Sequence, residues 1–315
     1  MHSRIRGGPL PRVSCANGTT MAESILSSAR AITKAASRQT YYTIRWLVDK
    51  DLTEDAFLAY AYFRWVDDAI DTPTGDRAAR LEFVARQRKI LERLEAGEVV
   101  AGLAPEEHML SELLRRRRHG HAGLSSYLHR MMSVMEFDAR RRGRLITQAE
   151  LDGYSDLLAT AVMDALGYFI GHRHLYPRSN ARTLAVVGAH IGHMLRDTSA
   201  DVSAGYFNIP RHVLDAGRIA PDDVASPAYR DWVRRRVALA RAHLREGKRY
   251  IRSMGNARSQ VAGYLYCARF DYVLDLIELD GFSLRQDYSR LSAFPFWLRA
   301  AGLGRPPAAG LTARR

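Results

Sequence analysis

The sequence predicts an all-α protein, and three observations support this class. Nearly every segment repeats its apolar residues with a period near 3.6, the period of an α-helix. No segment shows the regular alternation of apolar and polar residues that is typical of a half-buried β-strand. The chain also lacks a long linker, a low-complexity block and a short internal repeat. With 315 residues and 47% hydrophobic content, we expect one helical domain with a full core.

Proline and glycine divide the helical pattern in order along the chain. Residues 1–21 contain Arg, Gly and Pro but no apolar core of signal-peptide length, so we expect a disordered leader before the helical pattern opens. Breaks follow at 72–75, at 120–123, at 176–177, near 205–210 and at 226–227. The predicted helices span 22–36, 39–49, 53–72, 76–96, 105–118, 123–142, 147–175, 179–200, 226–252, 256–281 and 287–301. The helical domain would span 22–301, followed by a flexible tail at 302–315.

The formal net charge of +13 raises the question of a nucleic-acid partner. The basic runs Arg115–Arg118, Arg140–Arg142 and Arg234–Arg236 are separate and lack the interleaved aromatic residues of a single-strand binding track. We therefore predict no nucleic-acid partner and favour an anionic small-molecule substrate. No uncharged apolar run of membrane-spanning length occurs, which predicts no integral membrane segment. Cys15 and Cys267 do not make a disulfide framework, and this indicates a reducing, cytoplasmic location.

The segment 60–71 carries three carboxylates on an otherwise apolar helix. Asp67 and Asp68 precede Asp71 by four and three positions, so the three side chains converge on one face, with Arg64 one turn upstream. Burying three like charges is costly unless a cation neutralises them, and oxygen ligands in a cluster suit Mg²⁺. An exposed, solvated helix also carries Asp at this spacing, and that interpretation stays open for the motif taken alone.

A matching element lies at 190–201, where Asp197 and Asp201 are again four apart and Arg196 precedes them. Two such motifs on apolar helices, each beside an arginine, favour a functional site over two solvated faces. Facing acid helices of this kind would trap Mg²⁺ ions between them, and the ions would hold a diphosphate.

At these residues the chain resembles the squalene/phytoene synthase family, whose fold is an isoprenoid-synthase-type helical bundle around a central cavity. Residues 60–71 are similar to the family's Y-A-F-C-R-x-x-D-D-I-x-D, and residues 195–210 resemble its L-R-D-x-x-E-D-x-x-x-G-R-x-Y-L-P. Weaker similarities extend over most of 38–295. The resemblance implies Mg²⁺ ligands at Asp67, Asp68, Asp71, Asp197 and Asp201, and contacts to an allylic prenyl diphosphate from Thr40, Arg64 and Arg196. We also expect a pocket lined by Tyr41, Tyr62, Tyr154, Leu158 and Tyr206, although for Tyr154 and Leu158 on the helix over 147–175 a plain core position is the open alternative.

The departures from the family pattern gather around the second motif. His190 and His193 replace the usual Gln and Asn, Ala200 replaces Glu, Tyr206 replaces Arg, and Asp271 stands where the family often has Arg. These exchanges weaken metal and phosphate binding there. We infer that one diphosphate site survives and that the other pocket accepts an uncharged, aromatic molecule. The chain thus looks more like the squalene-synthase-like prenyltransferases of carbazole alkaloid pathways than like a squalene or phytoene maker.

We therefore expect a Mg²⁺-dependent prenyltransferase that moves a short prenyl group, C5 to C15, from its diphosphate to an aromatic small molecule. His193 and His190 share a face with Asp197 and are candidate bases, hydrogen-bond donors to the acceptor or metal-shell groups, although a packed core histidine is the plain alternative. Asp271 is a second candidate for orienting the acceptor, with an ion pair between helices as its plain alternative. The competing hypotheses are head-to-head condensation of two farnesyl or geranylgeranyl diphosphates, cyclisation of one prenyl diphosphate, and a non-catalytic binder of nucleic acid or an anionic membrane.

Overall fold

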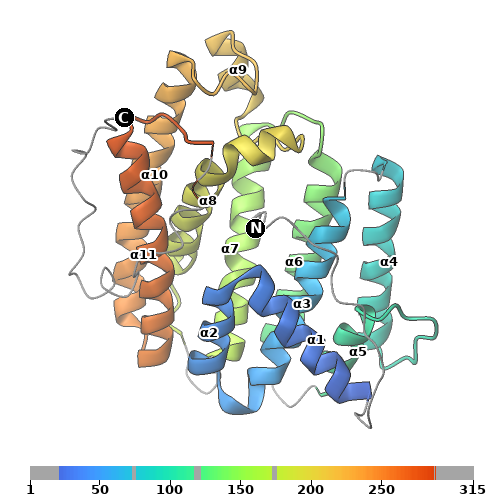
Figure 1. The fold of residues 1–315 in the computed structure, drawn as a ribbon. Coiled ribbons are helices and arrows are strands. Elements are labelled where there is room, and N and C mark those ends of the chain that lie inside the picture. The colour runs from blue at the N-terminus through green and yellow to red at the C-terminus, as the bar shows by residue number, and fades with distance from the viewer. Residues whose placement is uncertain (1–20, 73–75, 117–121, 172–175, 287, 289–315) are drawn as a thin grey trace, which may run out of the picture. The chain divides into compact units, whose positions relative to one another are not determined.

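The computed structural model describes residues 21–72, 76–116, 122–171, 176–286 and 288, and Figure 1 shows their arrangement into helices. Helices α1 to α11 carry most of these residues, and the described part of the chain contains no β-strand, which confirms the all-α class. The predicted helix over 287–301, the tail at 302–315 and the leader up to residue 20 lie outside the described residues. The contacts divide the chain into two compact units, and the single domain expected from the sequence stays a prediction.

The N-terminal unit draws its residues from Ser3–Arg142 and Thr160–Leu175. It contains α1 (Met21–Ala36), α2 (Arg38–Leu47), α3 (Thr53–Ile70), α4 (Arg77–Glu95), α5 (Glu107–Arg115) and α6 (Ala122–Arg141). Helix α3 is the centre of this unit, because it packs against α1, α2, α4, α5 and α6. Its side chains are accordingly buried on every side, including Leu58, Tyr62 and Phe63. The acidic residues at its end are therefore held on a rigid element.

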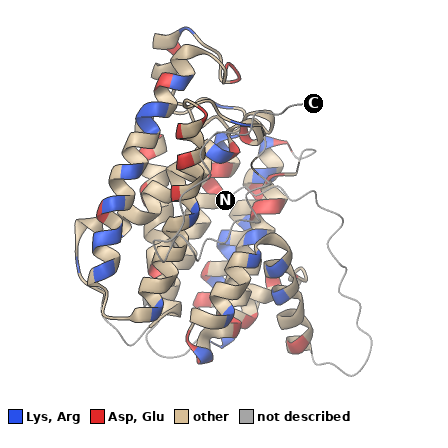
Figure 2. Ribbon diagram, turned by 60° about the vertical axis from the view of Figure 1, so that its left-hand side comes forward, with Lys and Arg blue, Asp and Glu red and all other residues tan. Residues whose placement is uncertain are grey.

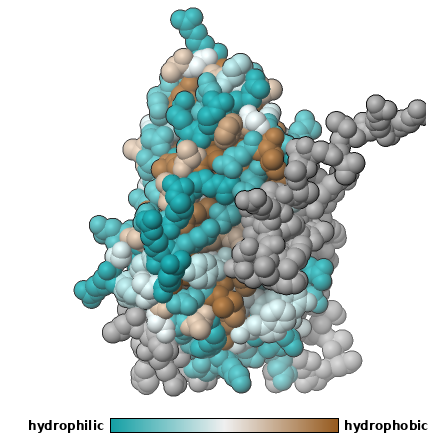
Figure 3. Space-filling model, turned by 90° about the vertical axis from the view of Figure 1, so that its left-hand side faces the viewer, coloured by the Kyte–Doolittle hydropathy of each residue, from teal (hydrophilic) through white to brown (hydrophobic). Residues whose placement is uncertain are grey.

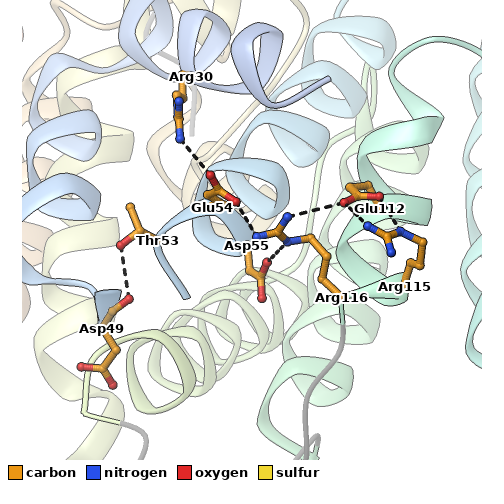
Figure 4. A network of polar contacts seen from close by, with 8 residues as sticks. All are labelled: Arg30, Asp49, Thr53, Glu54, Asp55, Glu112, Arg115 and Arg116. Carbon is orange, nitrogen blue, oxygen red and sulfur yellow. Dashed lines mark hydrogen bonds and ion pairs between the residues drawn. The ribbon is translucent and has the colours of Figure 1, made fainter. Parts of the chain in front are cut away.

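An ion-pair network, buried at Asp55 and Glu112 but partly exposed at Arg30 and Glu54, ties α3 to its neighbours, as Figure 4 shows. Asp55 is 2% exposed, and its carboxylate accepts a 2.9 Å hydrogen bond from Nε of Arg116. The same guanidinium also contacts Glu54 and, at 3.5 Å, Glu112 of α5. Arg30 of α1 reaches Glu54 at 3.1 Å. Removing one partner of such a network leaves a buried charge uncompensated, so these pairs fix how α1, α3 and α5 pack.

Helix α7 (Gln148–Phe169) ends before the predicted helix over 147–175 does. Gly171 has φ +76°, a left-handed conformation that does not continue a right-handed helix. Its N–H donates to the carboxylate of Asp49 at 2.9 Å, and the N–H of Asp49 donates to the carbonyl of Phe169 at 2.9 Å. A residue 120 positions upstream thus satisfies the end of α7, which periodicity could not indicate.

The C-terminal unit draws its residues from Gly143–Ala159 and Tyr176–Arg315. It contains the first turns of α7, then α8 (Leu184–Ser203), α9 (Arg211–Gly217), α10 (Pro227–Ser253) and α11 (Ala257–Leu279). A separate 3₁₀ turn over Asn180–Thr183 precedes α8, so the predicted helix at 179–200 begins later and ends later. Helix α9 was not predicted.

Glycines allow α8 and α10 to approach each other closely. A Cβ on Gly247 of α10 would lie 2.3 Å from the backbone nitrogen of Ala185 in α8, and one on Gly188 would lie 2.9 Å from the carbonyl oxygen of Ala240. Any side chain at Gly247 would overlap backbone atoms that cannot move alone. Helix α11 packs on both helices, so α8 is held from two sides.

The outer face of α10 is strongly basic. Figure 2 shows Lys and Arg recurring along its length, and Figure 3 shows that the side of the molecule with α10 and α11 is largely hydrophilic. Arg234 and Arg235 of one predicted basic run are exposed, whereas Arg236 is buried. The run therefore contributes mainly a solvated helix face. In the part of the chain that the structure describes, no helix is long and apolar enough to cross a membrane.

Candidate active site

The first acid cluster comprises Arg64, Asp67, Asp68 and Asp71 at the end of α3. The side chain of Asp67 is 1% exposed, and its Oδ2 lies 3.4 Å from Nη1 of Arg64. Nε of Arg64 donates to Oδ2 of Asp68 at 3.1 Å, and its Nη2 contacts the other oxygen of that carboxylate. Asp71 is the C-cap residue of the helix. The arginine therefore acts as an internal counter-ion for two of the three carboxylates.

The electrostatics of this cluster favour an additional cation. Burial raises the pKa of Asp67 well above its ordinary value, and the neighbouring carboxylates of Asp71 and Asp138 raise it further, whereas Arg64 lowers it. The upward effects win, with burial the largest of them, so the ionised form of Asp67 is costly here without a further cation. A divalent cation would stabilise the ionised carboxylates at this position.

The end of α6 supports the first acid cluster from the side. Asp138 and Arg141 are both almost fully buried and form a 2.6 Å ion pair with each other. Nη1 of Arg142 donates to the carbonyl oxygens of Ile70 at 3.3 Å and Thr72 at 3.1 Å. These two bonds satisfy carbonyls at the C-terminal end of α3, where helices have no internal donors left. They hold the backbone beside Asp71 in place.

The second acid cluster comprises His193, Arg196, Asp197 and Asp201 on α8. Arg196 binds its neighbour Asp197 through two hydrogen bonds of 2.7 Å, and both side chains are about nine-tenths buried. Nε2 of His193 lies 3.5 Å from Oδ2 of Asp197. Asp201 is buried and accepts a 2.8 Å hydrogen bond from Nδ2 of Asn208. Asn208 orients this aspartate, and sequence reasoning had assigned it no role.

The surroundings of His193 favour its neutral form. Burial lowers the pKa of its imidazole well below the ordinary value, and the nearby charges of Arg196 and Arg269 lower it further, as does His190. The approach of His193 to Asp197 is therefore not an ion pair. A neutral imidazole keeps one lone pair, so it can accept a proton from a substrate.

Aromatic rings surround the two histidines. The ring of Phe270 in α11 lies 6.0 Å from that of His193, and Tyr266 packs edge-on against Phe270 at 5.2 Å. Tyr154 of α7 packs edge-on against His190 at 5.0 Å. Tyr154, His190 and Phe270 are buried, so these rings make an apolar, aromatic environment beside the second acid cluster.

Arg269 and Asp271 lie on different faces of α11. Asp271 pairs with Lys248 and, at 3.3 Å, with Arg241, both on α10. Arg269 belongs to the other face, one turn after Tyr266, and its charge acts on both His193 and Tyr266. Asp271 therefore lies in an ion pair between helices, which is the plain alternative that the sequence left open for it. Arg269 and Tyr266 were missed, although their helical spacing with Phe270 was a usable signal.

The remaining predicted site residues divide between the two units. Tyr62 is fully buried and its hydroxyl donates to Gln87 at 3.1 Å, so its ring is held in the contact between α3 and α4. The hydroxyl of Thr40 donates to the N-cap serine of α2 at 2.9 Å. Half-buried Tyr41 packs near Phe57 at 5.3 Å. Leu158 and Tyr206 are buried in the C-terminal unit.

The donor set fits Mg²⁺, although the arginines now hold the carboxylates. Among the described residues, no three His, Cys, Asp or Glu side chains converge closely enough to ligate an ion. In each cluster an arginine bonds an aspartate that would otherwise be free to turn toward a cation. The acidic groups supply only oxygen donors, partly buried and in excess over the positive charge, which is the chemistry that Mg²⁺ selects. The predicted Mg²⁺ ligands are Asp67, Asp68 and Asp71 in the first cluster and Asp197 and Asp201 in the second.

Comparison with known proteins points to one family. A family model described as squalene/phytoene synthase matches residues 33–294. The structure is similar to squalene synthase HpnC from Alicyclobacillus acidocaldarius, with 20% identity, a TM-score of 0.63 and coverage of 84% of this chain and 97% of that chain. It is also similar to a dehydrosqualene synthase, with 14% identity, a TM-score of 0.68 and coverage of 90% and 96%. At these identities the likeness shows the fold. No protein of curated function gives a significant sequence match.

Proposed function

The chain belongs to the squalene/phytoene synthase family, whose members transfer prenyl groups, and from this premise we propose that it alkylates an aromatic small molecule. The prenyl donor in this proposal is an allylic diphosphate with a C5 to C15 chain, and Mg²⁺ is the cofactor. A carbazole-type ring system is the acceptor class that the departures from the family pattern favour.

We assign a part in diphosphate binding to each acid cluster. Bound Mg²⁺ would supply Lewis-acid stabilisation of the departing diphosphate. Arg64 and Arg196 would then turn from their aspartates to the diphosphate oxygens, because the metal replaces them as counter-ions of the carboxylates. Each arginine lies on the same helix as its aspartate partner and within one turn of it. A side-chain rotation would therefore be enough for this exchange. Asn208 and Arg142 keep Asp201 and the end of α3 in place.

The bond changes of the proposed reaction balance without a redox partner. The allylic C–O bond breaks and its electron pair leaves with the diphosphate. A ring carbon of the acceptor forms a C–C bond with the allylic carbon, and the ring proton passes to His193. The rings of Phe270, Tyr266 and Tyr154 would exclude water from the allylic cation and stabilise its charge.

The position of His193 carries the choice of an aromatic acceptor, because its Nε2 lies 3.5 Å from Oδ2 of Asp197 in the second acid cluster. Burial and the nearby arginines lower the pKa of this imidazole, which favours the unprotonated form that can accept a ring proton. It lies beside Asp197 of the second acid cluster and near the ring of Phe270. An imidazole, two carboxylates and several aromatic rings within the C-terminal unit support this proposal.

One observation favours head-to-head condensation of two prenyl diphosphates. Arg269 and Arg196 both act on His193 and Tyr266, so the second acid cluster has two cations near it. Two arginines suit a second diphosphate better than an uncharged ring. The loss of an arginine at the family position now held by Asp271 is thus partly offset by its neighbour Arg269.

Product analysis separates these functions. We would incubate the protein with Mg²⁺ and geranyl, farnesyl or geranylgeranyl diphosphate, with and without NADPH, and then add carbazoles, indoles and phenols. The proposal predicts prenylated aromatics and only slow diphosphate release without an acceptor. Squalene, phytoene or their cyclopropyl precursor would establish condensation instead, and a new terpene formed without acceptor would establish cyclisation. Omitting Mg²⁺ should stop each of these reactions.

A further inference from the structure

Helix α2 presents aromatic and basic side chains together on one exposed face. Arg38, Tyr42, Arg45 and Trp46 follow one another at helical spacings of four, three and one, which places them on one side of the helix. Trp46 is 67% exposed, the largest exposed aromatic side chain in the described part of the chain. We call these four residues the α2 surface.

The aromatic pair of the α2 surface is ordered although it is exposed. The rings of Tyr42 and Trp46 stack with centroids 4.7 Å apart and planes 24° apart. Ile44, on the opposite side of the helix, is buried and anchors α2 against the N-terminal unit. Tyr42 is half-buried, so the exposed apolar surface of the pair belongs mainly to the indole of Trp46. An isolated exposed hydrophobic residue is ordinary, but an indole stacked on a phenol between two arginines is a surface of defined chemistry.

All charged side chains on α2 are positive. Helix α2 contains no acidic residue, and both of its arginines at positions 38 and 45 are exposed. Lys34 at the end of α1 and Lys50 just after α2 are exposed as well. Among the described residues, Arg38, Arg45 and Lys50 form no ion pair. These cations are thus available to an anionic partner, and the whole chain, with a net charge of +13, is attracted to the same kind of partner.

We propose that the α2 surface docks the protein on the surface of an anionic phospholipid bilayer. Trp and Tyr favour the interface between lipid headgroups and acyl chains because one part of each ring system is apolar and another forms hydrogen bonds. Arginine side chains at the same level pair with lipid phosphates. A short helix lying in the plane of the interface satisfies both requirements, with Ile44 and the protein core behind it.

A lipid surface fits this face better than a folded protein partner does. The two exposed arginines of α2, with Lys34 and Lys50 at its ends and Asp51 as an exposed acidic neighbour, would require a partner surface of negative charge. A bilayer rich in phosphatidylglycerol supplies that charge over any area. The pair of rings is also small, whereas a stable protein interface needs a larger buried surface. The inference is independent of the proposed function, because it concerns docking and not chemistry.

Vesicle flotation tests the inference. The full-length protein should float with vesicles of phosphatidylcholine and phosphatidylglycerol but not with phosphatidylcholine alone. Trp46→Ala and the double change R38E/R45E should each lower the bound fraction at least tenfold. The matched control is R235E/R245E, which makes the same change in net charge at two exposed arginines of α10. A second control, Val99→Ala, removes an apolar side chain that is 93% exposed elsewhere.

Fluorescence locates the contact. Trp46→Phe should keep most of the binding but remove the blue shift that vesicles induce in the tryptophan emission. Thermal melts of every variant establish that it is folded. Failure of the wild-type protein to bind anionic vesicles would overturn the inference. Equal losses in R38E/R45E and R235E/R245E would also overturn it, because they would show attraction by net charge alone. Binding to one soluble protein, with no vesicle binding, would assign the α2 surface to that partner instead.

Discussion

Arg196 forms two parallel 2.7 Å hydrogen bonds with Asp197, the residue that follows it in the chain. The pair is about nine-tenths buried, so the arginine neutralises an aspartate that the family pattern assigns to metal binding. Arg64 does the same for Asp67 and Asp68 on α3. Each acid cluster therefore carries an internal counter-ion, although burial still raises the pKa of Asp67 well above its ordinary value.

Asp68→Asn and Asp197→Asn should each lower turnover of prenyl diphosphate by more than roughly 100-fold. Each change keeps the shape of the side chain but removes a charged oxygen donor for Mg²⁺. Diphosphate release at saturating Mg²⁺ measures the effect. Asp231→Asn on the exposed face of α10 is the matched control and should leave the rate unchanged. Full activity in both cluster variants would remove the metal assignment.

His193→Ala should lower transfer to the acceptor by about 100-fold or more while slow hydrolysis of the prenyl diphosphate continues. The variant loses the proton acceptor but keeps the acid clusters, so ionisation persists and water captures the cation. Comparing prenylated product with released prenyl alcohol measures this split. An unchanged ratio of the two products would reduce His193 to a packing residue.

Asp271→Asn should reduce the free energy of unfolding by about 1–3 kcal/mol, because Lys248 and Arg241 lose a charged hydrogen-bond partner. Its effect on kcat should be small, since these partners lie on α10.

Arg269→Met should behave in the opposite way and weaken binding of inorganic pyrophosphate in the presence of Mg²⁺, with little change in stability. Calorimetry and thermal melts measure the two effects separately. A large fall in kcat for Asp271→Asn, with normal stability, would return Asp271 to the catalytic group.

Gly247→Ala should destabilise the protein by about 1–3 kcal/mol, because the new methyl group would overlap the backbone of Ala185 and force α8 and α10 apart. Gly153→Ala is the matched control. Gly153 is also in a helix, but no atom lies within 4 Å of the position its Cβ would take. Since alanine is the better helix former, this variant should gain about 0.5–1 kcal/mol. Chemical denaturation of both variants measures the difference in the free energy of unfolding. Equal stabilities would contradict the prediction, because they would show that α8 and α10 can move apart without destabilising the protein.

The sequence alone determined the helical class, most helix positions and the two acid clusters. Apolar periodicity reports which residues lie on a common face of one helix, and the acid spacing reports which carboxylates converge. Both properties depend only on residues within one helix, so they can be predicted without knowledge of the fold. The family assignment rests on the same local motifs and agrees with the match over residues 33–294.

Only the tertiary structure decided which partner each face meets. Asp49 ends α7, Asn208 holds Asp201, Gln87 takes the hydroxyl of Tyr62, and α10 takes the carboxylate of Asp271. These contacts join residues from 7 to 122 positions apart. A period of 3.6 fixes the direction of a side chain relative to its own helix axis, but packing of other helices fixes what lies in that direction. The charge state of His193 and the exposed aromatic pair of α2 follow from that packing, and for this reason neither could be predicted from the order of residues.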